Sequence, residues 1–353
     1  MKCLPASKLP AAHGAVLHDW HAEILALRAF NRFLVDECAA LASSGARASD
    51  FVMRRDAAEI SRTVPQPFAL HTDVEIHMYC SEAPCGDASM ELTMDAQQDP
   101  TPWSLPVNPT SAASEEMRGR GYFSELGIVR RKPARPDAPP TLSKSCTDKI
   151  ALKQCTSLLN APAALLLDPR TAYLHTLILP ESQHVPAATT RAFGSSGRMA
   201  PLVSGGTGTW PHGYSFRPFE VQTVSQEFEW SRRSALPEQK LVPCNLSALY
   251  TPLHREVIIN GALQGRKQGD IKGASAVSRR AMWSAIADIG KRLGRDAIPE
   301  VTDLLGLLAA SRDYAAVKRI PLLLERKRAK DLAKADALHG WANNVGDDSF
   351  NID

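Results

Sequence analysis

Residues 72–88, TDVEIHMYCSEAPCGDA, carry the pattern that decides the fold. Four apolar side chains, Val74, Ile76, Met78 and Cys80, alternate with polar ones along this stretch. A period of two predicts a β-strand with one buried face. The strand leads directly into a turn with the sequence Pro-Cys-Gly-Asp, and we expect that turn to begin a helix.

On the N-terminal side of this strand, residues 19–41 predict an amphipathic helix. His21 and Glu23 fall at the entry of this helix. Its apolar side chains recur at helical spacing, and they are Ile24, Leu25, Leu27, Phe30, Phe33 and Leu34.

On the C-terminal side, an apolar run over residues 146–167 predicts a second helix. Residues 171–179 and 257–260 have the pattern of further strands. The stretches 98–118 and 132–141 are rich in proline, serine and charge, so we expect surface loops there.

The last part of the chain, from Ser275 onward, is mainly helical by spacing, with breaks at Pro299 and Pro321. Strands and helices alternate in the first half, and helices dominate the end. This order predicts an α/β sandwich extended by a helical C-terminal part.

The composition indicates a soluble globular protein. Of its 353 residues, 44% are hydrophobic, which suffices for a substantial core. We find no apolar run long enough to span a bilayer and no signal peptide. Seven cysteines, an odd number, do not suit a disulfide framework. We therefore expect an intracellular protein of the nucleus and/or cytoplasm, with no membrane association and no obligate protein partner.

The net charge of +3 is too small to indicate nucleic-acid binding unless the charge is clustered. Basic clusters occur at residues 130–132, 279–280 and 318–334. Runs of this kind are more often a solvated face than a binding site, and we expect that here.

The sequence His21-Ala22-Glu23, followed later by Pro84-Cys85, matches the first part of the zinc deaminase pattern H-x-E…P-C-x-x-C. The second cysteine of the pattern is absent, because Ala88 stands in its place. A catalytic zinc ion needs three protein ligands and an open position for water.

The missing third ligand must therefore come from elsewhere in the chain. Cys146 is the best candidate, whereas the rival thiols of Cys80 and Cys155 lie in apolar patterns and are expected in the core. Two thiolates and an imidazole hold Zn²⁺ tightly. The metal lowers the pKa of its bound water, and the resulting hydroxide can attack C6 of adenine. Glu23 then moves the protons.

Three segments resemble the deaminase motifs of the adenosine deaminase family, which includes the RNA-editing deaminases and the eukaryotic tRNA adenosine deaminases. They are residues 18–23 (HDWHAE), 77–88 (HMYCSEAPCGDA) and 145–149 (SCTDK). The similarity continues to the C-terminus. The resemblance implies a cytidine-deaminase-like α/β/α sandwich with a helical C-terminal extension.

In this family the third zinc ligand is a distant cysteine, so the resemblance implies His21, Cys85 and Cys146 as ligands. It also implies Glu23 as the proton shuttle. In the tRNA enzymes, adenosine 37 next to the anticodon of alanine tRNA becomes inosine. Residues 131–137, followed by 140–143, look like the KPGRxD segment of those enzymes.

The family also buries inositol hexakisphosphate in its C-terminal half as a structural cofactor. An aspartate like Asp19 bonds a lysine like Lys149 and links the metal site to the phosphates. The residues that the resemblance assigns to the phosphates are Arg28, Lys149, Lys153, Lys267, Tyr314, Lys318, Trp341 and Asp348.

We expect residues 1–353 to form a single deaminase domain that lacks the first N-terminal elements of the family. The family has a helix and strands before a Gly-Thr-Lys-Cys segment, and this chain begins at Lys2-Cys3 of that segment. Two other functions remain open. One is editing of adenosine in duplex RNA, disfavoured by the missing RNA-binding module, and the other is an inactive RNA-binding protein.

Overall fold

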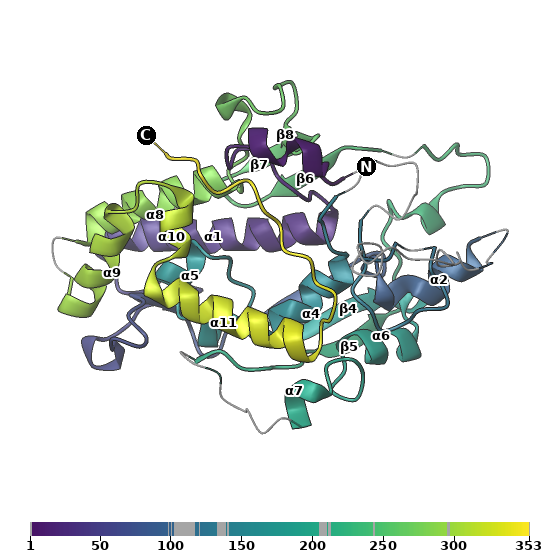
Figure 1. Cartoon of the computed structure of the whole chain (residues 1–353), viewed down its shortest axis with the longest axis horizontal. Helices are drawn as coiled ribbons and strands as arrows, with labels where there is room; N and C mark the ends of the chain where they lie inside the picture. Colours follow the sequence, from purple (N-terminus) through teal and green to yellow (C-terminus); the bar gives the residue numbers. More distant parts are fainter. Residues whose placement is uncertain are drawn as a thin grey trace, which may run out of the picture.

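A mixed α/β fold is arranged around one long helix, α1, which spans Ala22–Ser44. In Figure 1, α1 runs across the middle of the molecule, with the C-terminal helices α8, α10 and α11 beside it. The computed structural model describes residues 2–352 except for 98, 100, 102–116, 120, 133–138, 140, 205–209, 211–212, 243 and 295–296.

The sequence of α1 explains both of its ends. His21 is the N-cap, and Gly45 ends the helix in the left-handed conformation with φ 71°. Glycine adopts this conformation without the steric cost of a Cβ atom. Leu25 and Leu34 are buried on the apolar side. The helix expected over residues 19–41 is therefore confirmed, displaced by three residues at each end.

Three parallel strands form the central sheet in the order β3-β4-β5. Met78 on β3 lies opposite Leu177 on β4. The expected alternation is confirmed, because Ile76, Met78 and Cys80 are buried while His77 and Tyr79 are exposed. The bounds of the strands are His77–Tyr79 for β3, Thr176–Pro180 for β4 and Glu220–Val224 for β5.

Two smaller antiparallel sheets complete the strands of the described residues. Strands β1 and β2 pair with each other, and β6, β7 and β8 form a second sheet that contacts α1 through β6. The strand expected at 257–260 is β7, which begins two residues earlier. The bounds are Val52–Arg54, Phe68–Leu70, Ser247–Tyr250, Arg255–Ile259 and Ala262–Leu263 for β1, β2, β6, β7 and β8.

One long helix over residues 146–167 is not formed, so that expectation was wrong. Helix α4 ends at Thr156, and Ser157 takes a left-handed φ of 57° that turns the chain. This turn lets Leu158 and Leu159 both enter the core. Among the described residues of the first two thirds, the helices besides α1 are α2 (Met90–Asp95), α4 (Cys146–Thr156), α5 (Ala163–Leu166), α6 (Pro186–Phe193) and α7 (Pro201–Ser204).

The expected helical C-terminal part is present. Pro299 and Pro321 each occupy the first turn of a helix, where a missing N–H costs nothing, so they begin helices as well as separate them. Helix α8 packs on α1, and α11 packs on α4. The bounds are Arg279–Leu293 for α8, Pro299–Ala309 for α9, Tyr314–Lys318 for α10 and Pro321–Asp336 for α11.

Short 3-10 turns connect these elements. The one directly after the Pro-Cys-Gly turn, η3, confirms that a helical segment begins there. The turns are η1 (Ala6–Ala11), η2 (Ala57–Glu59), η3 (Asp87–Ser89), η4 (Pro169–Thr171), η5 (Glu181–Gln183), η7 (Arg232–Ser234) and η8 (Ile271–Gly273). Within the described residues, every helix is too short or too polar to cross a bilayer.

The basic clusters are not simply solvated faces, which corrects that expectation. Arg130 and Lys132 are buried, with 0% and 4% of their surface exposed. On α11, Arg326 is buried while Lys327 and Arg328 face solvent. Burial of a cation requires compensating partners or an anion. The loops expected at 98–118 and 132–141 fall largely outside the described residues.

Candidate active site

Three potential metal ligands converge where α1, the Pro-Cys-Gly turn and α4 meet. His21, Cys85 and Cys146 each offer a ligand atom, and these atoms lie within 4.8 Å of one another. Bonds of 2.0–2.3 Å to one zinc ion would place such atoms roughly 3.5–3.8 Å apart. The cluster is therefore close to ligating geometry, and two sulfurs with one imidazole are a donor set that suits zinc.

The turn that carries Cys85 is held against the start of α4. Thr147 donates its N–H to the carbonyl of Cys85 at 3.0 Å and its hydroxyl to the carbonyl of Pro84 at 2.9 Å. Gly86 has φ 116°, and a Cβ atom there would lie 2.2 Å from the Ser145 hydroxyl. Only glycine allows this close approach.

Cys146 occupies the first turn of α4, whose N-cap is Ser145. The Ser145 hydroxyl accepts a hydrogen bond from the Asp148 N–H at 3.1 Å, which fixes the helix start. The Cys146 N–H points to the sulfur of Cys85 at 3.4 Å. The positive end of a helix favours a thiolate, so the fold prepares this corner for negative sulfur.

Hydrogen bonds and burial shift the pKa values of all three groups. A hydrogen bond from Cys146 holds the pKa of the Cys85 thiol well below its usual value, whereas burial raises the pKa of Cys146. Burial opposes protonation of His21, but hydrogen bonds to Cys3 and Cys85 outweigh it and raise its pKa to about 9. A metal ion would displace these protons, so its affinity should fall as the pH is lowered.

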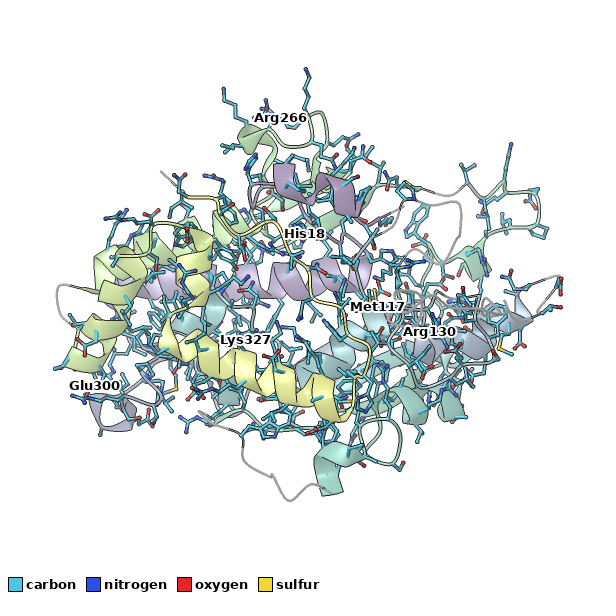
Figure 2. All side chains as sticks on the ribbon, viewed as in Figure 1. His18, Met117, Arg130, Arg266, Glu300 and Lys327 are labelled. Atoms are coloured by element: carbon cyan, nitrogen blue, oxygen red, sulfur yellow. The ribbon has the colours of Figure 1, made fainter. Side chains whose placement is uncertain are left out.

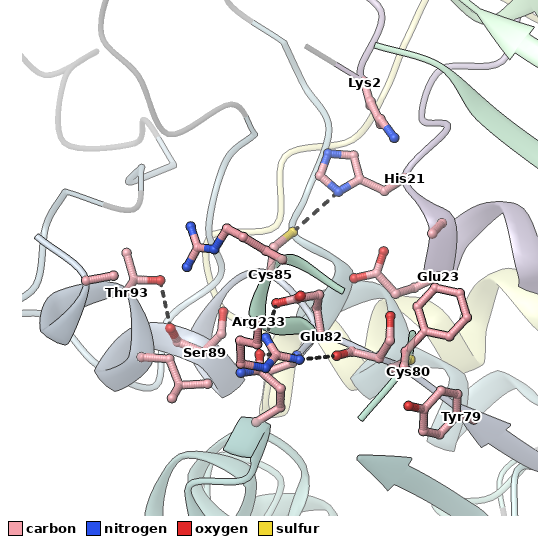
Figure 3. Close-up of a pocket in the computed structure, with 18 of the residues that line it drawn as sticks. Lys2, His21, Glu23, Tyr79, Cys80, Glu82, Cys85, Ser89, Thr93 and Arg233 are labelled. Atoms are coloured by element: carbon pink, nitrogen blue, oxygen red, sulfur yellow. Dashed lines mark hydrogen bonds and ion pairs between the residues drawn. The ribbon is translucent and has the colours of Figure 1, made fainter. Parts of the chain in front are cut away.

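Glu23 lies beside the cluster, two residues after His21 in the first turn of α1. Figure 3 shows its carboxylate below the His21 ring and to one side of the Cys85 sulfur. Burial and the charge of the Cys85 thiolate raise the pKa of this carboxyl. A carboxyl group with a raised pKa, beside a metal site, is suited to accept and return a proton.

A chain of charged groups leads inward from the metal cluster. The Lys132 ammonium donates to the Cys146 sulfur at 2.9 Å and to the Asp19 carboxylate at 3.0 Å. Lys149 also donates to Asp19, so the expected ion pair between them is present. Although burial alone would raise it, these two lysines hold the pKa of Asp19 well below its usual value.

Two residues of this site were not predicted from the sequence. Lys132 belongs to a basic run that resembles surface charge, and its partner Asp19 is 113 positions away. Cys3 forms a second group of potential ligands with Asp19 and His21. The local patterns around Lys132 and Cys3 do not indicate contact with the metal cluster, because only the tertiary fold brings these residues there.

The rival thiols lie elsewhere. Cys80 and Cys155 are both buried, with 5% and 0% of their surface exposed, and burial raises the pKa of each. Among the described residues, neither belongs to a group of three potential ligands. Both behave as core residues, as their apolar patterns predicted.

The cluster opens into a pocket of about 1200 Å³. Its wall includes His21, Glu23 and Cys85, together with Tyr79 on β3 and Glu82 in the turn after that strand (Figure 3). Its volume exceeds the usual range of small-molecule pockets, roughly 300–1,000 Å³. The pocket is therefore larger than a single small molecule requires.

Two of the predicted phosphate-binding residues, Arg28 and Lys153, form an inner group of cations with Arg326 and Lys330, which were not predicted. Burial and the charges of Arg326, Lys330 and Arg28 lower the pKa of Lys153 well below its usual value. Burial and Arg326 lower that of Lys330 to about 7. The Nε atoms of Arg28 and Arg326 have no hydrogen-bond partner among the described residues. Uncompensated charge of this kind is the expected setting of an anion.

The other predicted phosphate-binding residues border this group or lie apart from it. Tyr314 is buried and stacks on Phe350, with ring centroids 5.1 Å apart. Lys318 is 48% exposed and forms an ion pair with Asp348 at 2.8 Å, so the two ends of α10 have different surroundings.

Trp341 and Lys267 also have different surroundings from each other. The Lys144 ammonium lies 5.3 Å from the centre of the Trp341 ring, and that of Lys334 lies 5.9 Å from it. Lys267 is exposed, and its neighbour Arg266 projects from the outer edge of the molecule in Figure 2. The structure therefore does not bring Lys267 into the inner group.

Comparison with known proteins gives a consistent result. The family model of the adenosine-deaminase (editase) domain matches residues 1–344. The tRNA-specific adenosine deaminase 1 of Schizosaccharomyces pombe is 38% identical over 297 residues, which cover 83% of this chain and 72% of that protein.

More distant relatives share shorter or weaker matches. The tRNA-specific adenosine deaminase 1 of Saccharomyces cerevisiae is 34% identical over 186 residues, covering 51% of this chain and 44% of that protein. The double-stranded RNA-specific editase Adar of Drosophila melanogaster is 24% identical over 326 residues, covering 90% of this chain and 44% of its own length.

Proposed function

Because this chain belongs to the adenosine-deaminase (editase) domain family, we propose that it converts adenosine to inosine in tRNA by zinc-dependent hydrolysis. The observation that carries the proposal is the convergence of His21, Cys85 and Cys146 beside the carboxylate of Glu23. Relatives named as tRNA-specific adenosine deaminases support tRNA as the substrate class.

The residues of the site divide the chemistry among them. His21, Cys85 and Cys146 would hold a zinc ion, which would lower the pKa of a water molecule and so supply a nucleophile near neutral pH. Glu23 removes a proton from the attacking water and delivers it to the purine ring nitrogen. It then takes the proton of the new C6 hydroxyl and delivers it to the C6 amino group, which leaves as ammonia, so the Glu23 carboxyl must alternate between its two protonation states.

Lys132 and Asp19 support the metal ligands through hydrogen bonds. The ammonium of Lys132 stabilises the thiolate form of Cys146, and Asp19 anchors Lys132 from its other side. Asp19 also accepts the N–H of His21 at 3.0 Å, which fixes the helix entry that carries the imidazole. We therefore assign Asp19 the relay role between the metal cluster and Lys149.

Within tRNA, we propose position 37 next to the anticodon of alanine tRNA as the target. This rests on the resemblance of residues 131–137 to the tRNA enzymes, and residues 133–137 lie outside the described part of the chain. A tRNA substrate is found in the nucleus and cytoplasm, and we propose either or both as the location. The parallel sheet and C-terminal helices support a single domain of cytidine-deaminase-like sandwich type with a helical extension.

Substrate class is tested by incubating the purified protein with alanine tRNA, with its isolated anticodon stem-loop, and with a long RNA duplex. We expect inosine at position 37 of the tRNA and little or none in the duplex. Preferential deamination of the duplex would favour RNA editing, and inosine in none of the three would favour an inactive RNA-binding protein.

We also propose that the inner cations bind inositol hexakisphosphate. Lys153, Lys330 and Arg28 are partly buried and lie close to like charges, and this arrangement is unfavourable unless an anion compensates it. The Lys153 ammonium already donates to the carbonyls of Leu158 and Leu159, at 2.8 Å each, which aims it into the interior. When bound, the polyphosphate supplies negative charge for folding and takes no part in the chemical step.

Denaturation of the purified protein should therefore release one inositol hexakisphosphate per chain, which mass spectrometry detects. Lys153→Gln should lower both this content and the melting temperature, because it removes a buried donor to the anion. Lys327→Gln is the matched control on α11, since that side chain is 68% exposed. Folded protein that releases no inositol phosphate would contradict the assignment.

A further inference from the structure

One loop of the described structure is fixed directly to the turn that carries the metal cluster. We call residues 227–234 the rim loop. Arg233 in this loop donates to the carboxylate of Glu82 at 3.0 Å and to the carbonyl of Ser81 at 2.8 Å. It also donates to Glu227 at 3.1 Å within the loop. The rim loop is thus tied to the residues just before Pro84-Cys85.

Hydrogen bonds inside the rim loop fix its shape. The Ser231 N–H and the Ser234 hydroxyl both donate to the carbonyl of Phe228, at 2.9 and 2.8 Å. The Ser231 hydroxyl accepts the N–H of Ser234 at 3.2 Å and caps the short turn η7. These bonds fix the backbone of the loop, while Phe228, Trp230 and Arg232 face solvent.

Those outward side chains are two aromatic rings and a guanidinium. Phe228 is 45% exposed and Trp230 is 78% exposed. Arg232 is exposed, and no ion pair to it occurs in the described part of the chain. Phe228 and Arg232 line the same pocket as Glu23. A rigid loop that holds aromatic and cationic groups in solvent gains nothing for folding from them.

These three groups match the chemistry of a single-stranded nucleotide. Every base offers a flat face to an aromatic ring, and each phosphate offers a charge to arginine. An unpaired base beside a reaction site is commonly held by stacking rather than by hydrogen bonds to one sequence. The position of the loop, at the pocket mouth, favours RNA over a protein partner.

We propose that the rim loop binds the unpaired nucleotides that flank the reacting adenosine. Phe228 stacks on the immediate neighbour at the pocket wall, Trp230 stacks on the next base outward, and Arg232 contacts the phosphate between them. This inference rests on the proposed function, because it takes the pocket to hold an adenosine of a larger RNA.

Binding is measured with Glu23→Gln protein, so that the RNA is not consumed, on an anticodon stem-loop. Phe228→Ala and Trp230→Ala should each weaken binding about fivefold or more, the lower limit for loss of one stacked base. Phe228→Tyr and Trp230→Phe should restore most of the affinity. Tyr250→Ala is the control, since Tyr250 on β6 is 67% exposed and outside the pocket.

A second substrate separates stacking from a general loss of shape. Two further RNAs each carry one abasic nucleotide beside the target adenosine, one on its 5′ side and the other on its 3′ side. With one of these two RNAs, Phe228→Ala should cause no further loss of affinity, because the base that Phe228 stacks on is already missing. Stacking of Trp230 should also quench its fluorescence on binding, and Trp230→Phe removes that signal.

The outcomes distinguish the two levels of the argument. If wild-type protein forms inosine but Phe228→Ala and Trp230→Ala bind RNA like Tyr250→Ala, the rim-loop assignment is wrong. It is also wrong if the effect of Phe228→Ala is the same on intact and on both abasic RNAs. If wild-type protein forms no inosine in any RNA while the binding losses persist, the proposed function fails and the nucleotide-binding surface stands.

Discussion

Glu23→Gln should lower the rate of inosine formation by roughly 10²- to 10⁴-fold, the usual contribution of a general acid–base group. The amide keeps the size and packing of the carboxyl at the first turn of α1, but it cannot take up and release a proton. Because Glu23 is not a member of the His21, Cys85, Cys146 group of ligands, zinc content and melting temperature should remain unchanged.

Single-turnover assays of inosine formation on tRNA, with metal analysis of the same samples, test this result. Glu37→Gln supplies a control on the same helix, away from the pocket lining. A Glu23→Gln protein with near-normal turnover would remove this residue from the mechanism. A loss of zinc in the variant would instead assign Glu23 a structural role.

Cys146→Ala should abolish both tight zinc binding and activity. Wild-type protein is expected to hold one zinc ion per chain, and removal of one thiolate leaves only two ligands from the cluster. The change also leaves the Lys132 ammonium without the sulfur it contacts at 2.9 Å, so the buried charge loses one of its two partners. Elemental analysis of purified protein gives the zinc content directly.

Cys155→Ala is a close control, since both cysteines are fully buried in α4. It should retain zinc and activity and lose only a modest part of the folding free energy, as for a small core residue. The assignment of the third ligand is wrong if Cys155→Ala loses the metal while Cys146→Ala retains it.

The features that the sequence predicted best are those that depend on neighbouring residues. His21 and Glu23 are two residues apart at a helix start, and Cys85 follows an alternating strand, so spacing alone placed each on its element. The distant partner Cys146 was less accessible to such reasoning. The apolar patterns around Cys80 and Cys155 favoured Cys146 by elimination, and the family resemblance, in which the third ligand is a distant cysteine, supported that choice.

Long-range charge compensation could not be predicted from the sequence. Arg130 and Lys132 have the pattern of surface charge, yet carboxylates and carbonyls from remote segments compensate them in the interior. Similarly, the resemblance assigned Tyr314 and Lys318 together to the phosphates, which implies one shared environment. On the short helix α10 the ring is buried while the ammonium reaches Asp348 at the surface.

The break at Ser157 had no clear sequence signal either. Serine rarely adopts a left-handed φ, and the apolar residues on both sides continue a helical pattern. The tertiary structure overrides that pattern, because the turn buries Leu158 and Leu159 and directs their carbonyls to Lys153. Packing of two leucines outweighs the local cost of one strained residue.

The three ligands also have a topological meaning for the chain. His21 and Cys85 are 64 positions apart, and Cys85 and Cys146 are 61 positions apart. A metal ion bound to all three acts as a cross-link that closes two long loops, as a pair of disulfides does in a secreted protein. Closing a loop of this length lowers the entropy of the open chain by an equivalent of roughly 4 kcal/mol. While the ion stays bound, the first half of the chain can open only as a set of tethered loops, and chelation releases both constraints at once.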